Sequence, residues 1–553
     1  MSWSEPSVGG RRWALRPSPL GEDRPVAARI FSARGVDERF LSTGRGSLLD
    51  PGGMLGLERA VSRIDDARRR AEPIRLVTDY DVDGTTSCLI LHAALDVLGG
   101  AELSYHIPDR FTEGYGLSVY AVEKAARDGV RLLVTADIGV RDHLAVARAR
   151  ELGLDVIVCD HHLPAGESVP EAAAAVLCPP QSGCEYGNKA LAACGVSLKL
   201  ATALLDSHPR RDAILGSMLK LAAIGTVADI VSLATPENRA IVHLGLEALN
   251  AGPHSAGLAA LLDVAGVKAG EIDTTALGWR VGPRINAAGR LADATAVVRL
   301  LRERDDATAR AGAALLDELN RERQQITGEL LEMALARVPD PLPAFVVVAG
   351  PEEEGFHRGV VGIVAAKLRE KLGRPAAVVS VIGAVATGSI RSLPGVHAVR
   401  ALDAVSAHLH RYGGHAAAAG FSCDAAKLEQ VARGLAEWVE SHHDVDELDE
   451  IAMVDAIVSP AACDRRLVAD LSRLEPCGKD NERPRLVVRG TPERVRVMKD
   501  KHLGFSLGAL KGVWWNAAEH RDRLTSTREF MGSLSLNRWQ DREEVQLVVE
   551  DGR

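Results

Sequence analysis

The sequence predicts a multidomain α/β protein built on a parallel sheet. Between residue 74 and about residue 235, continuous apolar runs that suit buried strands alternate with helical patterns. A second, shorter α/β pattern follows from residue 341, and short alternating runs that suit a small barrel occupy the C-terminal part. A chain of 553 residues has room for two to four domains at roughly 100–200 residues each.

We therefore predict five segments. They are an N-terminal lead-in packed on the first domain (1–70), a parallel-sheet catalytic domain (71–305), a connecting helix (306–340), a second, smaller α/β domain (341–447) and a β barrel similar to an oligonucleotide-binding (OB) fold (448–553). The long charged pattern of 306–338 predicts the helix, and three prolines between 339 and 343 end it.

The first domain is expected to contain five parallel strands. Its apolar runs lie at 74–78, 103–107, 132–135, 156–159 and 173–177, with helices near 57–64, 87–97, 117 and 143–152. Ligands of such sheets bind beyond the carboxyl ends of the strands. Polar residues at these ends are therefore the first candidates for function.

Composition excludes several classes of protein. A net charge of −9 and a pI near 6.0 give no overall attraction to nucleic acid or anionic membranes. A polyanion would therefore have to bind at local clusters of basic residues. Eight scattered cysteines without a CxxC pair indicate reduced thiols. The start lacks a signal-like apolar stretch, and no apolar run reaches the ~18 residues of a membrane span. We expect a cytoplasmic protein.

Three aspartates follow the first predicted strand. Asp79, Asp81 and Asp83 stand at i, i+2 and i+4, which places them on one face if the chain stays extended. Carboxylates so close together repel one another unless they retain protons or bind cations. The stretch therefore predicts a metal site. Residues 84–87 could add backbone N–H groups for a phosphate or serve as an ordinary helix start.

Further ligand-type residues end three other apolar stretches. Asp137 follows the strand at 132–135, His161 and His162 follow 156–159 within an Asp-His-His sequence, and Asp229 ends an apolar helical segment. One such aspartate is more often a helix cap or turn residue, but the joint pattern indicates a shared site. Oxygen and imidazole ligands favour Mn²⁺ or Mg²⁺. So many carboxylates suggest two ions and hydrolysis at phosphorus.

Two later stretches suit contact with a phosphate backbone, each with a structural alternative. Arg280, Arg284 and Arg290 lie among glycines in a non-periodic stretch, where they could bind phosphates or form surface ion pairs in a loop. Gly413, Gly414 and His415 precede a run of alanines, which could be an approachable loop or a tightly packed helix. In the C-terminal barrel, Phe505, Trp514, Trp515 and Trp539 could stack bases or fill the core.

Taken together, these stretches resemble the DHH phosphoesterase superfamily, and within it the RecJ single-strand-specific exonucleases. Seven motifs stand in the family's order: 79–87, 135–139, 160–162, 225–229, 282–290, 388–392 and 413–420. The resemblance implies an exonuclease that degrades single-stranded DNA from its 5′ end with Mn²⁺ or Mg²⁺ in recombination and repair. Cys159 stands where Thr is common before the DHH motif.

The resemblance also implies residue roles. Two ions would be surrounded by Asp79, Asp81, Asp83, Asp137, His161 and Asp229, while His162 would contact the scissile phosphate. The 5′-terminal phosphate would be held by Arg110, Ser389 and Arg391, and His415 with its loop would grip the strand further along. Asp79 could be either a direct ligand or a partner of one. The protein would act as a monomer, with a single-strand-binding protein and a helicase as candidate partners.

Two alternatives stay open. A hydrolase of short oligonucleotides, cyclic dinucleotides or polyphosphate would resemble the two α/β domains but would generally lack the arginine-rich stretch and the barrel. A catalytically inactive DNA-binding scaffold would be expected to have lost metal ligands, and all of them are present here.

Overall fold

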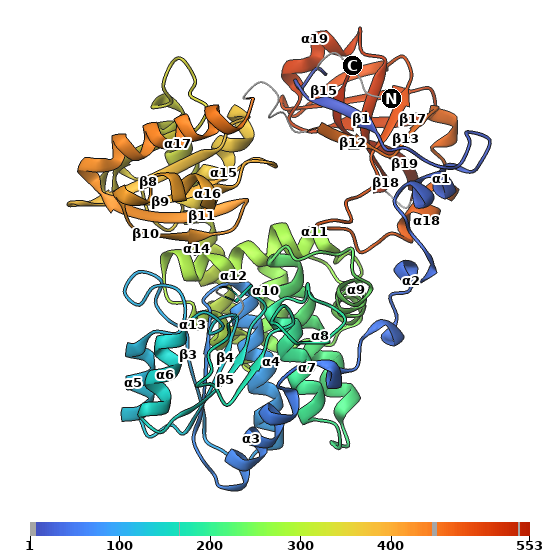
Figure 1. Cartoon of the computed structure of the whole chain (residues 1–553). Coiled ribbons are helices and arrows are strands. Elements are labelled where there is room, and N and C mark those ends of the chain that lie inside the picture. Colours follow the sequence, from blue (N-terminus) through green and yellow to red (C-terminus); the bar gives the residue numbers. More distant parts are fainter. Residues whose placement is uncertain (1–6, 165, 167, 445–450, 540–541) are drawn as a thin grey trace. The chain divides into compact units, whose positions relative to one another are not determined.

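The computed structural model describes residues 7–164, 166, 168–444, 451–539 and 542–553 (Figure 1). Two compact units are distinguished. The parallel-sheet unit contains Val36–Asn320 and Arg473–Arg483, and the second unit contains Met1–Gly35, Arg321–Ser472 and Pro484–Arg553. The boundary predicted between 447 and 448 lies outside the described residues.

The predicted parallel sheet is confirmed. Its strands are β2 (Ile74–Thr78), β3 (Leu103–His106), β4 (Leu132–Ala136), β5 (Asp155–Cys159) and β6 (Ala175–Leu177), in the order β3-β2-β4-β5-β6. All neighbouring pairs are parallel. β3 therefore lies on one side of β2 in the sheet, and the next strand in the sequence, β4, lies on the other side of β2. The carboxyl ends of β2 and β4 thus flank a switch point, where ligands of such sheets bind.

Helices cover both faces of this sheet. The helices α3 (Leu57–Arg69), α4 (Val82–Leu98) and α7 (Ala193–Leu204) pack on the face that includes Leu76, and α5 (Val119–Arg127) and α6 (His143–Glu151) pack on the face that includes Val77. Successive side chains of a strand point to opposite faces, so an uninterrupted apolar strand supplies both cores.

The arginine-rich stretch differs from expectation. Leu277–Val281 forms a π-helical turn that continues into α12 (Gly282–Leu291), so the expected non-helical conformation is wrong. Pro283 lies in the first turn of α12, directly after the π-helical turn. The buried residues Ile285 and Ala288 recur at helical spacing, but three glycines hid that pattern in the sequence.

Other helices complete the parallel-sheet unit. They are α8 (Arg211–Ala228), α9 (Pro236–Ala251), α10 (Ala256–Val264) and α13 (Thr295–Arg302). The predicted long helix is confirmed as α14 (Asp306–Ala336), which begins in the parallel-sheet unit and ends in the second unit.

The predicted second α/β domain is a mixed sheet. It consists of β7 (Val346–Pro351), β8 (Ala376–Ile382), β9 (Val385–Arg391), β10 (Leu409–Gly414) and β11 (Ala418–Asp424), in the order β10-β11-β9-β8-β7. The helix α15 (Val361–Leu372) covers one face, and α16 (Ala398–Ala404) and α17 (Leu428–His442) cover the other. The alternative of an alanine-rich helix after Tyr412 is wrong, because β10 and β11 form a hairpin there.

The C-terminal region forms one seven-stranded sheet. Its strands are β13 (Ala456–Val458), β14 (Leu486–Arg489), β15 (Glu493–Met498), β16 (His502–Leu507), β17 (Leu510–Trp514), β18 (Glu529–Trp539) and β19 (Arg542–Gly552), in the order β13-β14-β18-β19-β17-β16-β15. Phe505 and Trp514 are buried in its core, whereas Trp515 is 53% exposed. The side chain of Trp539 lies outside the described part.

The N-terminal segment does not pack as expected. Strand β1 (Arg12–Leu15) pairs in parallel with β12 (Ile451–Val454), so this part of 1–70 belongs to the C-terminal region and not to the first domain. Trp13 is buried there, and its indole N–H donates to Asp551 at 3.1 Å. Such pairing over more than 400 residues leaves no local signal in the sequence.

Within the described residues, no helix is both long and apolar enough to cross a membrane.

Asp455 offers a test of how the N-terminal segment is held. Its buried carboxylate accepts two hydrogen bonds from Arg34 at 2.8 and 2.7 Å and one from Arg16 at 3.3 Å. Asp455→Ala leaves the largely buried Arg34 without this carboxylate, and we expect a loss of about 3–5 kcal/mol in the stability of this region. Pulse proteolysis in urea measures the loss. The exposed Asp522→Ala is the control, and equal stability of the two variants would contradict the assignment.

Candidate metal centre

The acidic motif after β2 spans a strand end and a helix start. Asp79 follows the strand directly, Asp81 is the N-cap of α4 and accepts a hydrogen bond from the Gly84 N–H at 3.1 Å, and Asp83 lies inside the first turn. The extended conformation therefore ends before Asp83. A Cβ at Gly84 would lie 2.3 Å from the Asp79 carbonyl oxygen, so this turn requires glycine.

Asp83 is fully buried and held by the start of another helix. Its two carboxylate oxygens accept hydrogen bonds from the Ala193 and Cys194 N–H groups at 2.7 and 2.8 Å, in the first turn of α7. Burial raises the pKa of Asp83, against the opposing charge of His161. The free amides and the dipole of a helix N-terminus stabilise a carboxylate at this place.

Asp137 occupies a strained backbone position at the end of β4. Its φ is +65°, which is costly for a residue other than glycine, and such strain gathers at functional sites. The carboxylate oxygen Oδ1 lies 3.3 Å from His161 Nε2 and 3.8 Å from His162 Nδ1. Burial, and then the charges of Asp81 and Asp83, raise the pKa of Asp137 well above its usual range.

Asp160, the first residue of the DHH motif, orients the two histidines. It accepts hydrogen bonds from the backbone N–H groups of His161, His162 and Val140 at 2.7, 3.1 and 3.0 Å, and its Oδ1 lies 2.8 Å from His162 Nδ1. Burial opposes its charge, but these hydrogen bonds lower the pKa of Asp160 to about 2. Burial also lowers the pKa of His162, but the bond with Asp160 outweighs it and the net shift is upward.

The predicted ligands meet at one place. Three groups have ligand atoms within 4.8 Å of one another: Asp79, Asp81 and Asp137; Asp83, His161 and Asp229; and Asp137, His161 and His162. Asp137 and His161 each belong to two groups, so the three groups form one connected cluster. It lies at the carboxyl ends of β2, β4 and β5, as the strand-end aspartates predicted.

The atoms of this cluster fit divalent cations. Asp79 Oδ1, Asp137 Oδ1 and His161 Nε2 are buried and have no hydrogen-bond partner among the described residues. Buried polar atoms nearly always have a partner, so these three unpaired atoms in one cluster fit the binding of a cation. Carboxylate oxygens with imidazole suit Mn²⁺ or Mg²⁺.

A segment without any sequence signal supports Asp229, the C-cap of α8. This segment is Arg473–Arg483. The carbonyl oxygen of its residue Lys479 accepts a hydrogen bond at 2.9 Å from the N–H of Leu233, which follows Asp229 by four residues. The buried Arg239 donates to four carbonyls of 473–476 at 2.7 to 3.5 Å. Burial and the carboxylates of the centre raise the pKa of Asp229, and the charge of Lys479 opposes this shift.

Two other residues lie near the centre, and of these Tyr115 was not predicted from the sequence. The Tyr115 hydroxyl lies 3.1 Å from His162 Nε2 and 3.3 Å from the carbonyl oxygen of Asp137. Gly225, on α8, has no room for a side chain, because a Cβ would lie 2.5 Å from Thr86 Oγ1 and 3.1 Å from Asp83 Oδ1. A lone tyrosine carries no motif, and the motif at 225–229 does not show what Gly225 contacts, so only the fold reveals these contacts.

The arginines predicted to meet DNA have different surroundings. Arg284 forms a salt bridge with the buried Asp317 at 2.8 Å, which joins two helices and is not the surface ion pair of a loop that the alternative expected. Arg280 donates to the Gly266 carbonyl, and Arg110 lies over the Tyr80 ring at 4.7 Å. Phosphate contact stays a prediction for Arg110, Arg280, Arg284 and Arg290.

The second α/β domain presents a compact polar cradle. Arg391 Nη1 donates to Ser389 Oγ at 3.0 Å, and both side chains lie against the first turn of α15. A Cβ at Gly362 would lie 2.9 Å from Ser389 Oγ and 3.1 Å from Arg391 Nη2. The N-cap residue Val360 cannot supply a side-chain hydrogen bond. A cation, a hydroxyl and uncapped amides at a helix start suit a phosphate group.

The glycines of the β10–β11 hairpin serve different purposes. Gly414 has φ +147° and a Cβ there would lie 2.4 Å from the Ala418 carbonyl oxygen, so the turn itself requires glycine. Gly413 faces open space, which leaves its backbone approachable. The His415 N–H donates to the Ala418 carbonyl at 2.8 Å and closes the hairpin. Contact of this hairpin with DNA stays a prediction.

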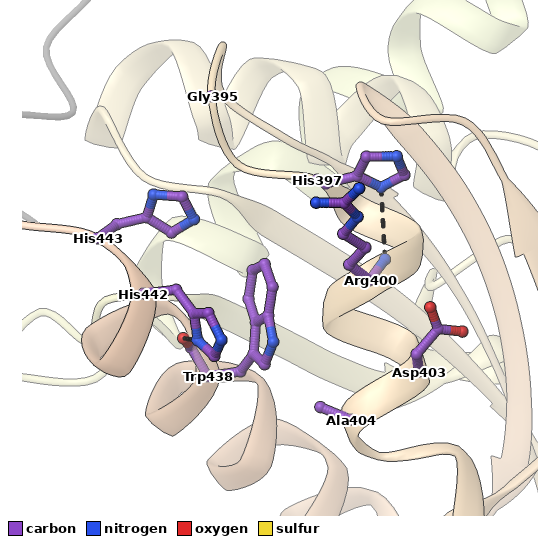
Figure 2. Close-up of a pocket in the computed structure, with 8 residues that line it drawn as sticks. All are labelled: Gly395, His397, Arg400, Asp403, Ala404, Trp438, His442 and His443. Atoms are coloured by element: carbon purple, nitrogen blue, oxygen red, sulfur yellow. Dashed lines mark hydrogen bonds between the residues drawn. The ribbon is translucent and has the colours of Figure 1, made fainter.

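The opposite face of the mixed sheet holds a separate hollow of about 590 Å³ between α16 and α17 (Figure 2). In this view Trp438 stands between His442 and Arg400, and its ring stacks on His442 with centroids 4.6 Å apart. Ser389 and Arg391 alternate with Ile390, which belongs to the core on this face, so the hollow and the cradle are distinct.

Comparisons with known proteins agree with this architecture. Residues 73–226 match the DHH family, N-terminal domain, residues 342–441 match the DHHA1 domain, and residues 454–551 match the RecJ OB domain. The single-stranded-DNA-specific exonuclease RecJ of Bacillus subtilis is 34% identical over 95% of this chain and 68% of the relative. The protein of the same name from Dickeya dadantii is 33% identical over 98% of both chains.

A solved structure is similar over nearly the whole chain. RecJ from Thermus thermophilus in complex with Mn²⁺ matches 96% of this chain and 76% of its own, with a TM-score of 0.79 and 29% identity. A second structure of that protein contains Mg²⁺. The sequence relatives, the three domains and the cluster of metal-type ligands lead to one conclusion: the chain belongs to the RecJ family of single-stranded-DNA-specific exonucleases.

Proposed function

We propose that this protein removes nucleotides from the 5′ end of single-stranded DNA by hydrolysis at a centre that holds two Mn²⁺ or Mg²⁺ ions, and that it serves recombination and repair. The observation that carries the proposal is the cluster of three linked ligand groups, which share Asp137 and His161. One divalent ion carries too little charge for five carboxylates, so the cluster would hold two ions, and Asp137 and His161 would be the residues common to the linked groups.

The proposed ligands are Asp79, Asp81, Asp83, Asp137, His161 and Asp229. When bound, the ions lower the pKa of the attacking water and offset charge on the phosphoryl oxygens. Asp83 keeps its place through the two α7 amides, so it stays fixed with or without metal. Asp79 stays in the set because it belongs to the group with Asp81 and Asp137 and because its Oδ1 is buried without a hydrogen-bond partner among the described residues.

His162 is proposed to contact the scissile phosphate. The bond between Asp160 and His162 Nδ1 fixes the ring and raises the pKa of the histidine, which favours a proton on Nε2. A protonated Nε2 can donate to a phosphate oxygen as charge grows there. Tyr115, 3.1 Å away, limits the movement of the ring.

Recognition of the strand is proposed to use both units. Ser389 and Arg391, with the first turn of α15, would hold the 5′-terminal phosphate, together with Arg110. Arg280, Arg284, Arg290, Gly413, Gly414 and His415 would contact the rest of the strand. We further propose that the protein acts as a monomer and that a single-strand-binding protein and a helicase are its partners.

Loss of a shared ligand should stop the reaction. We expect Asp137→Ala or His161→Ala to lower the rate of single-strand cleavage about 10³-fold or more, because each residue serves two ligand groups. Release of label from 5′-labelled and 3′-labelled DNA in Mn²⁺ measures both rate and polarity. Affinity for single strands should stay nearly unchanged, and normal turnover in either variant would refute the two-ion centre.

Arg391→Ala should weaken recognition of phosphorylated ends. Loss of a charged hydrogen bond costs about 1.5–3 kcal/mol, so we expect the preference for a 5′-phosphate over a 5′-hydroxyl to fall at least about 10-fold. Competition between the two substrates measures this preference. Arg400→Ala, on the opposite face of the same sheet, is the matched control. If the unmodified protein degrades both ends equally, the cradle has another purpose.

Gly225→Ala tests the packing behind the centre. The added methyl would meet Thr86, Cys194 and Asp83, so we expect Mn²⁺ affinity to fall about 10-fold or more. Gly216→Ala, on the same helix with nothing within 4 Å, should bind Mn²⁺ normally and gain up to about 1 kcal/mol in stability. Calorimetric Mn²⁺ titration and thermal unfolding separate the two effects. Equal metal affinity in both variants would contradict this assignment.

A further inference from the structure

A second polar cavity lies in the parallel-sheet unit away from the metal centre. Its volume is about 480 Å³, and it is lined by the second half of α4, the middle of α8, the start of α10 and the end of α13. None of the proposed metal ligands lines it. Lys220, one of its lining residues, stands nine positions before Asp229 on α8, a separation of ~13 Å along a helix.

The cavity carries an excess of positive charge. Its lining includes Lys220, Arg302 and Arg304, with Asp96 as the acidic residue. Lys220 is only 7% exposed, and its ammonium group donates to the Pro253 carbonyl at 2.6 Å. Within the described part of the chain, none of the three cations forms an ion pair with a carboxylate. A buried ammonium without a counter-charge is unfavourable, so the cavity favours an anion.

Part of the remaining wall of the cavity is apolar. Leu89, Leu258 and Leu301 are buried side chains that contribute to it, and Leu221 is partly buried beside them. The buried imidazole of His92 also lines the cavity. An apolar wall beside a cationic rim suits a flat aromatic group joined to a phosphate. The volume lies within the ~300–1,000 Å³ of typical small-molecule sites.

We propose that this cavity, here named the Lys220 pocket, binds a nucleoside monophosphate. The phosphate would lie at Lys220, Arg302 and Arg304, and the base would pack on the leucine wall. A nucleoside monophosphate is the chemical class of product that the proposed exonuclease releases, and this link to the reaction rests on the proposed function. Binding itself rests only on the shape and charge of the pocket.

The test is calorimetric titration of the full-length protein with deoxyadenosine 5′-monophosphate in EDTA. An Arg391→Ala background removes the cradle of the second domain as a competing site. We expect binding in this background, and at least about 5-fold weaker binding after Arg304→Ala. Arg304 is exposed, so this variant should fold. Arg310→Ala, an exposed arginine on α14 outside the pocket, is the matched control and should bind normally.

Lys220→Gln gives a second, independent variant and should also weaken binding at least about 5-fold. Deoxyadenosine and inorganic phosphate, titrated separately, should each bind more weakly than the nucleotide. The proposal is overturned if the nucleotide does not bind in the Arg391→Ala background or if both pocket variants bind normally. If Arg304→Ala and Lys220→Gln weaken binding of a short single-stranded oligonucleotide as much as they weaken binding of the mononucleotide, the proposal is overturned in favour of a DNA track.

Failure of the proposed function has a different signature. An inactive protein would show no release of label from DNA, while nucleotide binding in EDTA would persist. Asp137→Ala should therefore leave nucleotide binding at the Lys220 pocket unchanged, since that residue lies outside it.

Discussion

Repulsion among buried carboxylates is the constraint on which the rest of this structure depends. Asp79, Asp83 and Asp137 are at most 4% exposed, and burial together with neighbouring charges raises the pKa of each. A fold can hold such groups together only if rigid elements position them and opposite charge arrives from elsewhere. The strand ends of a parallel sheet supply the positions, and the first turn of α7 supplies two amides to Asp83. Asp79 Oδ1 and Asp137 Oδ1 have no hydrogen-bond partner among the described residues, so bound cations would have to balance their negative charge.

The first two residues of the DHH motif, Asp160 and His161, differ in how their polar atoms are stabilised. Asp160 is satisfied entirely by protein groups, with a pKa of about 2, so it stays ionised without metal. His161 Nε2 has no such partner and faces three carboxylates. Asp160 therefore holds its neighbours in position without a metal ion, whereas His161 Nε2 would gain a partner only from a bound ion. This division explains why a conservative change at Asp160 would act through His162 and not through direct coordination.

Much of this arrangement could be predicted from the sequence because it is local. Continuous apolar strands and the aspartates at their ends follow one another within a few residues, and β2, β4 and β5 lie where the pattern placed them. Contacts between distant segments could not be predicted. The pairing of β1 with β12 and the hold of Arg239 on 473–476 join residues over 200 positions apart without a motif. The helix α12 was missed because its glycines and Pro283 conceal the buried positions Ile285 and Ala288.

Charge also offers a physical basis for selecting the end of a strand. A terminal phosphate monoester carries a charge of about −1.5 to −2 near neutral pH, whereas an internal diester carries one negative charge. The cradle of Ser389, Arg391 and the start of α15 offers one cation and several N–H donors, with Gly362 leaving room beside them. Electrostatic attraction to such a cradle grows with the charge of the group that enters. An internal phosphate brings less charge and a second ester chain that needs space. Discrimination between an end and an interior position therefore needs no recognition of a base, only a pocket closed around one doubly charged group.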